Sequence, residues 1–235
     1  MNAEAFFEQV RDSLIVSAQA PDGHVLRHTP TIAMLAKAAE AGGATAIRCG
    51  GYGGVEDIQA VRASVSVPVI GLTKEGDTGV YITPSVESVK AVAQAGADVV
   101  AIDATDRPRQ DGATFGQQVA AAHECGALAM ADIATAEEAL AAHKAGADLI
   151  STTLAGYTEH REKTSGPDLE LIREIRALLE RECPGESVFL IGEGRFHTPS
   201  QVAEGKAAGA DAIIVGTAIT DTAWITQQFA AQAGA

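Results

Sequence analysis

Cysteine is scarce in this sequence, which holds three cysteines in 235 residues. Cys49, Cys125 and Cys183 are odd in number and widely spaced, and no C-x-x-C pair occurs. This spacing excludes a disulfide framework and indicates no zinc site. Unpaired cysteines are typical of a reducing compartment, so we expect a cytoplasmic protein without a metal site.

Positive charge is also in short supply. Lys and Arg together number 17 against 31 Asp and Glu, which gives a net charge of −14 at pH 7. No basic stretch could displace counterions from a nucleic acid, so we expect no nucleic-acid partner. No apolar run approaches the length of a membrane span, and residues 1–8 lack the basic and apolar regions of a signal peptide. We therefore expect no membrane partner.

Signatures of bound cofactors are absent as well. The chain has no G-x-G-x-x-G turn, no flavin signature that we recognise and no cluster of metal-ligating residues in its sequence. Hydride transfer in enzymes depends on a nicotinamide or flavin, so that chemistry has no carrier here. We expect a reaction that uses neither a metal nor an organic cofactor.

The sequence does contain one short motif in four copies. An Ala-Gly-Ala-Asp pattern, which reads Ala-Gly-Gly-Ala-Thr in its first copy, is followed each time by a short apolar run. The glycines that mark the copies are 54, 50 and 63 residues apart, at Gly42, Gly96, Gly146 and Gly209. A glycine at the end of a helical stretch predicts a helix C-cap, and the apolar run after it predicts a buried strand.

Four further apolar runs lie between these, at Leu14–Gln19, Pro68–Lys74, Leu128–Ile133 and Val188–Glu193. Continuous apolar runs are typical of parallel strands buried on both faces. Eight such strands alternating with helices predict an α/β fold, a closed (β/α)8 TIM barrel, with residues 1–235 as a single domain. The alternative is an open doubly wound sheet, which the even repeat and the missing dinucleotide turn disfavour.

Helix starts agree with this organisation. Thr135 with Glu138, and Thr198-Pro199 with Gln201, have the spacing of capping boxes. Thr83-Pro84 predicts another start of this kind, with proline at the first helical position. The polar segment 157–168 follows the sixth strand, and we expect it to be a long loop on the active face.

In such barrels the active site lies at the C-terminal ends of the strands. Lys74 ends the third strand and Glu193 ends the seventh, and strands four apart face each other across the mouth. A base and an acid would then flank one pocket from opposite sides, which suits the inversion of a carbon centre. The polar residues at the eight strand ends are Gln19, Arg48, Lys74, Asp103, Asp132, Thr152-Thr153, Glu193 and Gly216-Thr217.

Two aspartates among these have two interpretations each. Asp103 either serves the site or holds its own loop by pairing with Arg107 or Arg109. Asp132 either serves the site or caps a nearby helix. The sequence leaves both pairs of alternatives open, with a slight preference for a functional Asp132.

Two basic side chains are similarly undecided. Arg48 requires an anionic partner, which is either a substrate or a neighbouring carboxylate such as Glu56. His197 lies in the loop after the seventh strand, where it is either solvated or functional. Neither choice follows from the sequence.

The ends of the seventh and eighth strands are rich in glycine. They read Gly192-Glu193-Gly194-Arg195 and Val215-Gly216-Thr217-Ala218. These two strand ends often bind phosphate in TIM barrels, because glycine lets backbone N–H groups approach phosphate oxygens. The plain alternative is a pair of tight turns.

Segments from the first strand to the last match a known family. The less specific ones are Ile15–Ala20, Gly54–Ile58, Tyr81–Pro84, Met130–Ile133, Gly192–Arg195 and Val215–Thr220. More specific are Asp103-Ala104-Thr105 with Arg107-Pro108, and the run Thr152-Thr153-Leu154-Ala155-Gly156-Tyr157-Thr158. In these segments the chain resembles the N-acylglucosamine-6-phosphate 2-epimerases, also called N-acetylmannosamine-6-phosphate 2-epimerases.

The resemblance implies an isomerase of amino-sugar and sialic-acid catabolism that uses no metal or organic cofactor. It would interconvert N-acetylmannosamine 6-phosphate and N-acetylglucosamine 6-phosphate, with Lys74 and Glu193 as catalytic residues. Its partner would be this phosphorylated N-acyl amino sugar, and a homodimer is the assembly to be tested. The resemblance also implies substrate contacts by Gln19, Arg48, Asp132 and Arg195 and phosphate binding near Gly194, Gly216 and Thr217. Thr153, at a strand end, is a further candidate for substrate binding.

The implied reaction removes the C2 proton of the open-chain sugar and returns a proton to the other face. Lys74 can act as the base only if its pKa falls from about 10.4 towards neutrality. Two other functions stay open. One is a Schiff-base aldolase or other sugar-phosphate isomerase with Lys74 as nucleophile, and the other is a non-catalytic sugar-phosphate binding protein.

Overall fold

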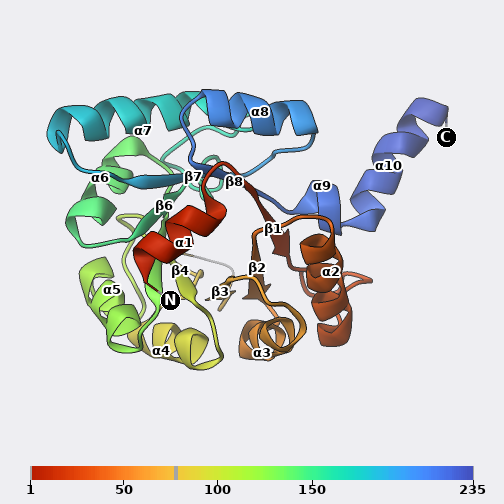
Figure 1. Cartoon of the computed structure of the whole chain (residues 1–235), viewed down its shortest axis with the longest axis horizontal. Coiled ribbons are helices and arrows are strands. Elements are labelled where there is room, and N and C mark those ends of the chain that lie inside the picture. The colour runs from red at the N-terminus through yellow and green to blue at the C-terminus, as the bar shows by residue number, and fades with distance from the viewer. Residues whose placement is uncertain (1, 77–78, 235) are drawn as a thin grey trace.

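Eight parallel strands form a closed barrel in this computed structural model, which describes residues 2–76 and 79–234. Each strand pairs with its neighbours in sequence, and β8 pairs with β1 to close the ring (Figure 1). The predicted (β/α)8 barrel is therefore confirmed, and the four strands predicted with bounds differ from those observed by at most one residue at either end. The strands are β1 (Leu14–Ala18), β2 (Ala46–Gly51), β3 (Val69–Thr73), β4 (Val99–Asp103), β5 (Leu128–Asp132), β6 (Leu149–Ser151), β7 (Phe189–Glu193) and β8 (Ala212–Val215).

Helices follow the strands and surround them. Figure 1 shows α2 to α8 around the outside of the barrel, whereas α10 leads away from it. Within residues 2–76 and 79–234, no helix is both long and apolar enough to cross a membrane. The helices are α1 (Ala3–Val10), α2 (Thr29–Ala41), α3 (Gly54–Ser64), α4 (Val86–Gln94), α5 (Phe115–Glu124), α6 (Ala136–Lys144), α7 (Leu169–Glu182), α8 (Pro199–Ala207), α9 (Thr217–Thr220) and α10 (Thr222–Ala233).

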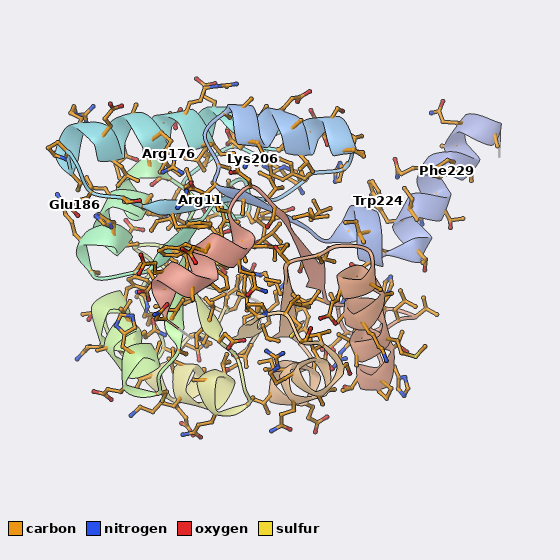
Figure 2. The ribbon with its side chains drawn as sticks, viewed as in Figure 1. Arg11, Arg176, Glu186, Lys206, Trp224 and Phe229 are labelled. Carbon is orange, nitrogen blue, oxygen red and sulfur yellow. The ribbon has the colours of Figure 1, made fainter. Side chains whose placement is uncertain are left out.

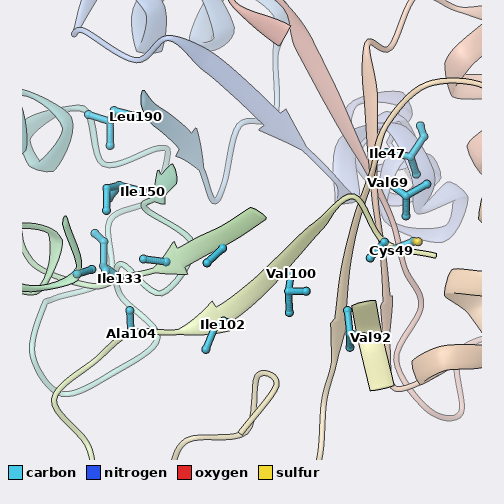
Figure 3. Close-up of a cluster of buried hydrophobic side chains, with 14 of the residues drawn as sticks. Ile47, Cys49, Val69, Val92, Val100, Ile102, Ala104, Ile133, Ile150 and Leu190 are labelled. Carbon is cyan, nitrogen blue, oxygen red and sulfur yellow. The ribbon is translucent and has the colours of Figure 1, made fainter. Parts of the chain in front are cut away.

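Two apolar layers hold the barrel together, because alternate residues of a strand point to opposite sides. In β3, Ile70 and Leu72 belong to the cluster inside the barrel, whereas Val69 belongs to the layer between strands and helices. Figure 3 shows part of this outer layer, including Val100 and Ile102 of β4. Both faces of each strand are thus buried, which explains why the strands read as continuous apolar runs.

Helix α1 closes the N-terminal end of the barrel. Its Phe6 and Val10 are buried in the inner cluster. Phe7 stacks on Phe189 at the start of β7, with ring centroids 4.6 Å apart, and the Arg11 guanidinium lies 5.0 Å from the same ring. Only the C-terminal end of the barrel is left for a site.

Helix starts agree with the sequence in two places and differ in a third. Both predicted capping boxes are present, at Thr135 before α6 and at Thr198 before α8. The Thr83-Pro84 prediction was wrong, because Ser85 is the N-cap of α4. The Thr83 hydroxyl instead donates to the Ala101 carbonyl at 2.7 Å, and Thr83 has a φ of +45°. The side chain joins a loop to β4 rather than capping a helix.

The repeated glycines lie at helix ends, as predicted, with a shift in the first copy. Gly96, just after the α4 cap residue Ala95, has a φ of 103°, which only glycine adopts readily. In the first copy this conformation belongs to Gly43, with a φ of 102°, whereas Gly42 keeps a right-handed φ of −82°. The double glycine of that copy therefore has one cap residue and one left-handed residue.

Candidate active site

The polar residues of the barrel mouth follow the last inward-facing apolar residue of each strand, at the next position on the same face. In β3 the positions of Ile70 and Leu72 lead to Lys74 two residues further on. In β7 those of Phe189 and Ile191 lead to Glu193. The same step along other strands leads to Ser17, Arg48, Asp132, Ser151 and Gly216. Because the strands are parallel, all these positions meet at one end of the barrel.

A cavity of about 370 Å³ opens at this end. Lys74 and Glu193 both line it, from β3 and β7, which are four strands apart in the ring. Six other predicted site residues line it as well: Gln19, Thr153, Gly194, Arg195, Gly216 and Thr217. The volume suits a small molecule. Arg48 and Asp132 are buried and are not part of the lining that the structure describes.

Lys74 is held by its backbone and leaves its amine near the cavity. Its N–H donates to the Gly51 carbonyl at 2.9 Å, and it forms an antiparallel bridge with Ile82. The ammonium nitrogen lies 5.4 Å from the centroid of the Tyr52 ring. Burial lowers the pKa of Lys74, and the positive charge of Arg48 lowers it further. Both effects favour the neutral amine that a general base requires.

Glu193 is held by three side chains. Its Oε2 accepts a hydrogen bond from the Ser151 hydroxyl at 3.3 Å and lies 2.9 Å from the Thr153 hydroxyl. Arg48 Nη1 lies 3.1 Å from the same oxygen. Burial raises the pKa of Glu193 against the opposing effect of Arg48, and Asp132 raises it as well. A carboxyl group whose protonated form is favoured in this way can donate a proton.

Arg48 and Asp132 form a buried ion pair beneath the cavity. The two side chains make a bidentate contact of 3.0 and 2.7 Å, and the Thr153 hydroxyl donates to Asp132 Oδ1 at 2.6 Å. Neither Glu56 as a partner of Arg48 nor a helix-capping role for Asp132 is correct, because the partners of Arg48 are Asp132 and Glu193. The bidentate contact with Asp132 fixes the guanidinium of Arg48, and Arg48 in turn holds the carboxylate of Glu193.

Gln19 has a buried acceptor without a partner among the residues that the structure describes. Its Nε2 donates to the Ser17 hydroxyl at 2.8 Å, whereas its Oε1 accepts nothing. Buried polar atoms in folded proteins are nearly always hydrogen-bonded, so an orphaned carbonyl oxygen beside a cavity suits a ligand that brings an N–H or O–H donor.

The glycine-rich ends of β7 and β8 border the same cavity. Gly194 has a φ of 105°, and Gly216 is the residue before the short helix α9. A Cβ atom added at Gly216 would lie 3.3 Å from the Ser17 Cβ and 3.6 Å from the Ser17 carbonyl oxygen. A larger side chain at position 216 would therefore press on Ser17, which lines the same cavity.

Arg195 lines the cavity, but each of its three guanidinium nitrogens also donates a hydrogen bond within the protein. It donates to the carbonyl oxygens of Gly166 at 3.0 Å and Ala155 at 2.8 Å, and to the Thr164 hydroxyl at 2.9 Å. Its guanidinium lies 5.3 Å from the centroid of the Tyr157 ring. Arg195 thus holds the loop after β6, and segment 157–168 is confirmed as a loop at the mouth.

Of the two interpretations of Asp103, the contacts support the one in which it holds its own loop. It forms an ion pair with Arg107 at 2.7 Å and accepts from the Thr105 hydroxyl at 2.7 Å. Arg109 donates to the Asp103 backbone carbonyl rather than to its carboxylate. The side chain is fully buried and is not part of the described cavity lining.

Several polar residues near the cavity were not predicted from the sequence. Ser17, Tyr52 and Tyr81 line it, and Ser151 reaches Glu193. Ser17 and Ser151 occupy inward-facing strand positions, so extending the alternation along β1 and β6 would have found them. The tyrosines come from loops, where no such pattern applies.

Two groups of side chains among the described residues could hold a metal ion, and both lie outside the cavity lining. One contains His143, Cys183 and Glu186, and the other contains Asp106, Glu138 and His160. Hydrogen bonds between His and Glu at 2.7 and 2.8 Å already join members of each group.

Comparison with known proteins agrees with this geometry. The family described as "Putative N-acetylmannosamine-6-phosphate epimerase" matches residues 32–235. The chain belongs to this family. A Corynebacterium glutamicum protein named "Putative N-acetylmannosamine-6-phosphate 2-epimerase" is 61% identical over 224 residues, covering 95% of this chain and 94% of the relative. A Cutibacterium acnes protein of the same name is 46% identical and covers 92% of this chain and 91% of the relative.

A solved structure extends the similarity to three dimensions. The N-acetylmannosamine-6-phosphate 2-epimerase from Clostridium perfringens superposes with a TM-score of 0.88 at 36% identity. The match covers 95% of this chain and 94% of that protein. A thiamine phosphate pyrophosphorylase from Pyrococcus furiosus, at 18% identity and a TM-score of 0.58, shares the fold alone.

Proposed function

We propose that this protein interconverts N-acetylmannosamine 6-phosphate and N-acetylglucosamine 6-phosphate by moving a proton at C2. The observation that carries the proposal is that Lys74 and Glu193 line one cavity from strands four apart, in a chain of this family. Inversion at a carbon needs a proton taken from one face and another given to the opposite face. Two groups on facing strands suit that requirement.

The C2 proton becomes acidic only next to a carbonyl, so the sugar ring must first open to the aldehyde. Lys74 then takes the proton, because its lowered pKa makes the neutral amine accessible. Glu193 gives a proton to the other face, because its raised pKa makes the carboxylic acid accessible. In the reverse direction the two residues exchange roles.

Arg48 and Asp132 act on this chemistry through Glu193. Arg48 sets the position and charge of the carboxyl group, and Asp132 holds Arg48 in place. The Thr153 hydroxyl contacts both carboxylates, at 2.6 and 2.9 Å. A positioned acid of this kind contributes about 10²–10⁴ to the rate of a proton transfer.

Binding of the substrate's phosphate is the part we assign to Gly194, Gly216 and Thr217. Backbone N–H groups at the ends of β7 and β8 would donate to the phosphate oxygens, as glycine-rich strand ends allow. Gln19 Oε1 offers an acceptor for a sugar hydroxyl or for the N-acyl N–H. Arg195 would contribute by keeping the loop after β6 over the cavity.

We further propose that residues 1–235 act as one barrel domain in the cytoplasm and that two copies form a dimer. Helix α10 supports the dimer. It has no buried residue and no charged residue, although the chain carries a net charge of −14. A solvated helix of an acidic protein would carry charge, whereas a helix covered by a second acidic copy is best left without it.

Exposed large apolar side chains lie on α10 and on elements near it in the fold. Of the six large ones that the structure describes, four belong to α2, the loop before it, α9 and α10: Met34 (72% exposed), Val25 (81%), Ile219 (45%) and Phe229 (73%). His24 of that loop lies 3.3 Å from Asp221 at the start of α10, so these elements adjoin. Such a patch is typical of a protein–protein contact.

Light scattering during size-exclusion chromatography tests the dimer. The native protein should have twice the chain mass, and Phe229→Glu should have the mass of one chain. Ala120→Glu places the same charge on the exposed face of α5 and should remain dimeric. A monomeric native protein, or a Phe229→Glu variant that stays dimeric, would rule out this contact.

Proton NMR tests the proposed reaction. Purified protein with N-acetylmannosamine 6-phosphate and EDTA, without NAD, should produce the signals of N-acetylglucosamine 6-phosphate. A requirement for NAD or a metal, or release of a three-carbon fragment, would contradict the proposal. A lysine adduct trapped by borohydride would favour the Schiff-base alternative, and binding without turnover would favour a binding protein.

A further inference from the structure

His197 belongs to the loop after β7 and lines the active-site cavity together with Gly194 of the same loop. Its backbone N–H donates to Gln201 Oε1 at 2.7 Å, inside the capping box of α8. Its ring lies against Trp224, with centroids 4.7 Å apart and planes tilted by 37°. His197 is therefore held by two contacts, one at its backbone N–H and one at its ring.

Trp224, which contacts the His197 ring, belongs to α10 near the C-terminus of the chain. Trp224 lies in the first turn of α10, whereas Phe229 lies further along the same helix (Figure 2). Asp221, the N-cap of α10, also lines the cavity and accepts from the Trp224 N–H at 2.9 Å. The base of α10 is thus part of the cavity rim.

The charged groups around His197 leave it suited to an anion. Arg195 is on the same loop, and Asp221, at the base of α10, is paired with His24 at 3.3 Å. Burial lowers the pKa of His197, and the nearby charge of Arg195 lowers it further. A bound phosphate would act against both effects and raise the pKa of His197, because a negative charge stabilises the imidazolium.

We propose that His197 binds the phosphate group of the substrate and that Trp224 is the positioning residue that holds its ring. The inference rests on the proposed function, since it assigns one end of the same substrate. The location favours phosphate over the reacting carbon. His197 follows β7 beside Gly194 and shares the cavity rim with Gly216 and Thr217 at the end of β8.

The contact would be a charge-assisted hydrogen bond from an imidazole N–H to a phosphate oxygen. Where the ring is neutral before binding, it takes up one proton from solvent, and no covalent bond changes at any pH. The gain in affinity is greatest at low pH, where the ring is protonated, and it fades as pH rises past the pKa of the complex. Trp224 contributes only by restricting the ring, so Phe at this position should replace it.

Steady-state kinetics of His197→Ala test the first half of the inference. We expect KM for the phosphorylated sugar and Ki for inorganic phosphate to rise by the same factor, on the order of tenfold, with kcat within about twofold. The difference between the native protein and the variant should shrink from pH 6 to pH 8.5. His143→Ala, which removes a histidine paired with Glu186 away from the cavity, should change neither constant. Unchanged KM and Ki in His197→Ala, or a loss confined to kcat, would overturn the assignment.

Two variants of Trp224 test the second half. Trp224→Ala should raise KM and Ki by a smaller factor than His197→Ala does, and Trp224→Phe should restore both constants. Combining Trp224→Ala with His197→Ala should add nothing, since the tryptophan acts through the ring. Additive losses would contradict a positioning role. If the native protein has no epimerase activity, the proposed function fails, but calorimetry with inorganic phosphate still measures whether His197 binds phosphate.

Discussion

The two ends of this barrel are built on opposite principles. At the N-terminal end, α1 covers the strands with apolar side chains, and Phe7 stacks on Phe189. Arg11 and Arg176, labelled in Figure 2, both pair with the Asp211 carboxylate. At the C-terminal end, charged side chains meet around a cavity, and buried atoms of Gln19 and Arg48 have no partner among the described residues. One end is closed by contacts that stabilise it, and the other is kept open for a ligand.

The pKa shifts of two residues at the C-terminal end show how the two ends differ in their effect on stability. Lys74 has its pKa lowered and Glu193 has its pKa raised, in both cases first because of burial. Each shift means that folding disfavours the charged form of that side chain. The mouth therefore reduces stability in exchange for reactivity, as active sites commonly do. Changes at the mouth should affect turnover, and changes at the closed end should affect folding.

The largest expected effect is on turnover at the mouth. Lys74→Met keeps the aliphatic bulk and removes the amine, so kcat should fall by about 10²-fold or more with the fold intact. Circular dichroism verifies the fold, and Lys90→Met, at an exposed position on α4, serves as the matched control. Turnover near that of the native protein would remove Lys74 from the mechanism.

A large effect on stability is expected at the closed end. Phe189→Ala removes a buried ring that contacts Phe7 and Arg11, so the free energy of unfolding should fall by about 3–5 kcal/mol. Urea denaturation measures the loss, and Phe189→Leu should lose less because it fills more of the space. The folded fraction of Phe189→Ala should keep the native kcat. A selective loss of kcat would show that the two ends are not separate in function.

A smaller effect is expected at the phosphate end of the cavity. Gly216→Val adds atoms facing Ser17, where even a Cβ would approach to 3.3 Å. KM for the phosphorylated sugar should rise by about tenfold, which corresponds to about 1.4 kcal/mol. Gly216→Ala should have an intermediate effect. In the native protein the unphosphorylated sugar should be a poor substrate, and equal turnover of both sugars would contradict the phosphate assignment.

The smallest effect is a gain in stability with a defined pH dependence. The pKa of Lys74 is lowered in the folded state, so the unfolded chain binds more protons between that pKa and about 10.4. Stability attributable to Lys74 therefore rises with pH across this window. Lys74→Met should be more stable than the native protein at neutral pH, and its advantage should shrink as the pH approaches 10. An advantage that grows with pH would have the wrong sign.

The parts that sequence predicts well are those governed by alternation and capping. The ends of β3 and β7 and the capping boxes at Thr135 and Thr198 follow from short local patterns, and the barrel follows from the repetition of such patterns along the chain. Lys74 and Glu193 are at the predicted strand ends, and their roles stay predictions. Local pattern is sufficient because a parallel strand is buried on both faces and ends at a common edge.

The parts that sequence does not predict depend on distant contacts. Thr83 looks like a helix cap, yet its hydroxyl bonds to Ala101 on β4. Arg48 could have paired with Glu56 nearby, yet it pairs with Asp132, 84 residues away. Partners of this kind are brought together by closure of the ring, which no segment of the sequence records. The exposed position of α10 is likewise a property of the packed chain.

Deuterium incorporation tests the central claim most directly. The native protein is incubated with N-acetylmannosamine 6-phosphate in D2O, with EDTA and without added cofactor, and C2 of the product is followed by proton NMR over many turnovers. Proton transfer by Lys74 and Glu193 predicts that solvent deuterium accumulates at C2, and that Lys74→Met abolishes this exchange. A product that keeps its original hydrogen throughout, or that forms only when NAD or a metal is added, would contradict the account.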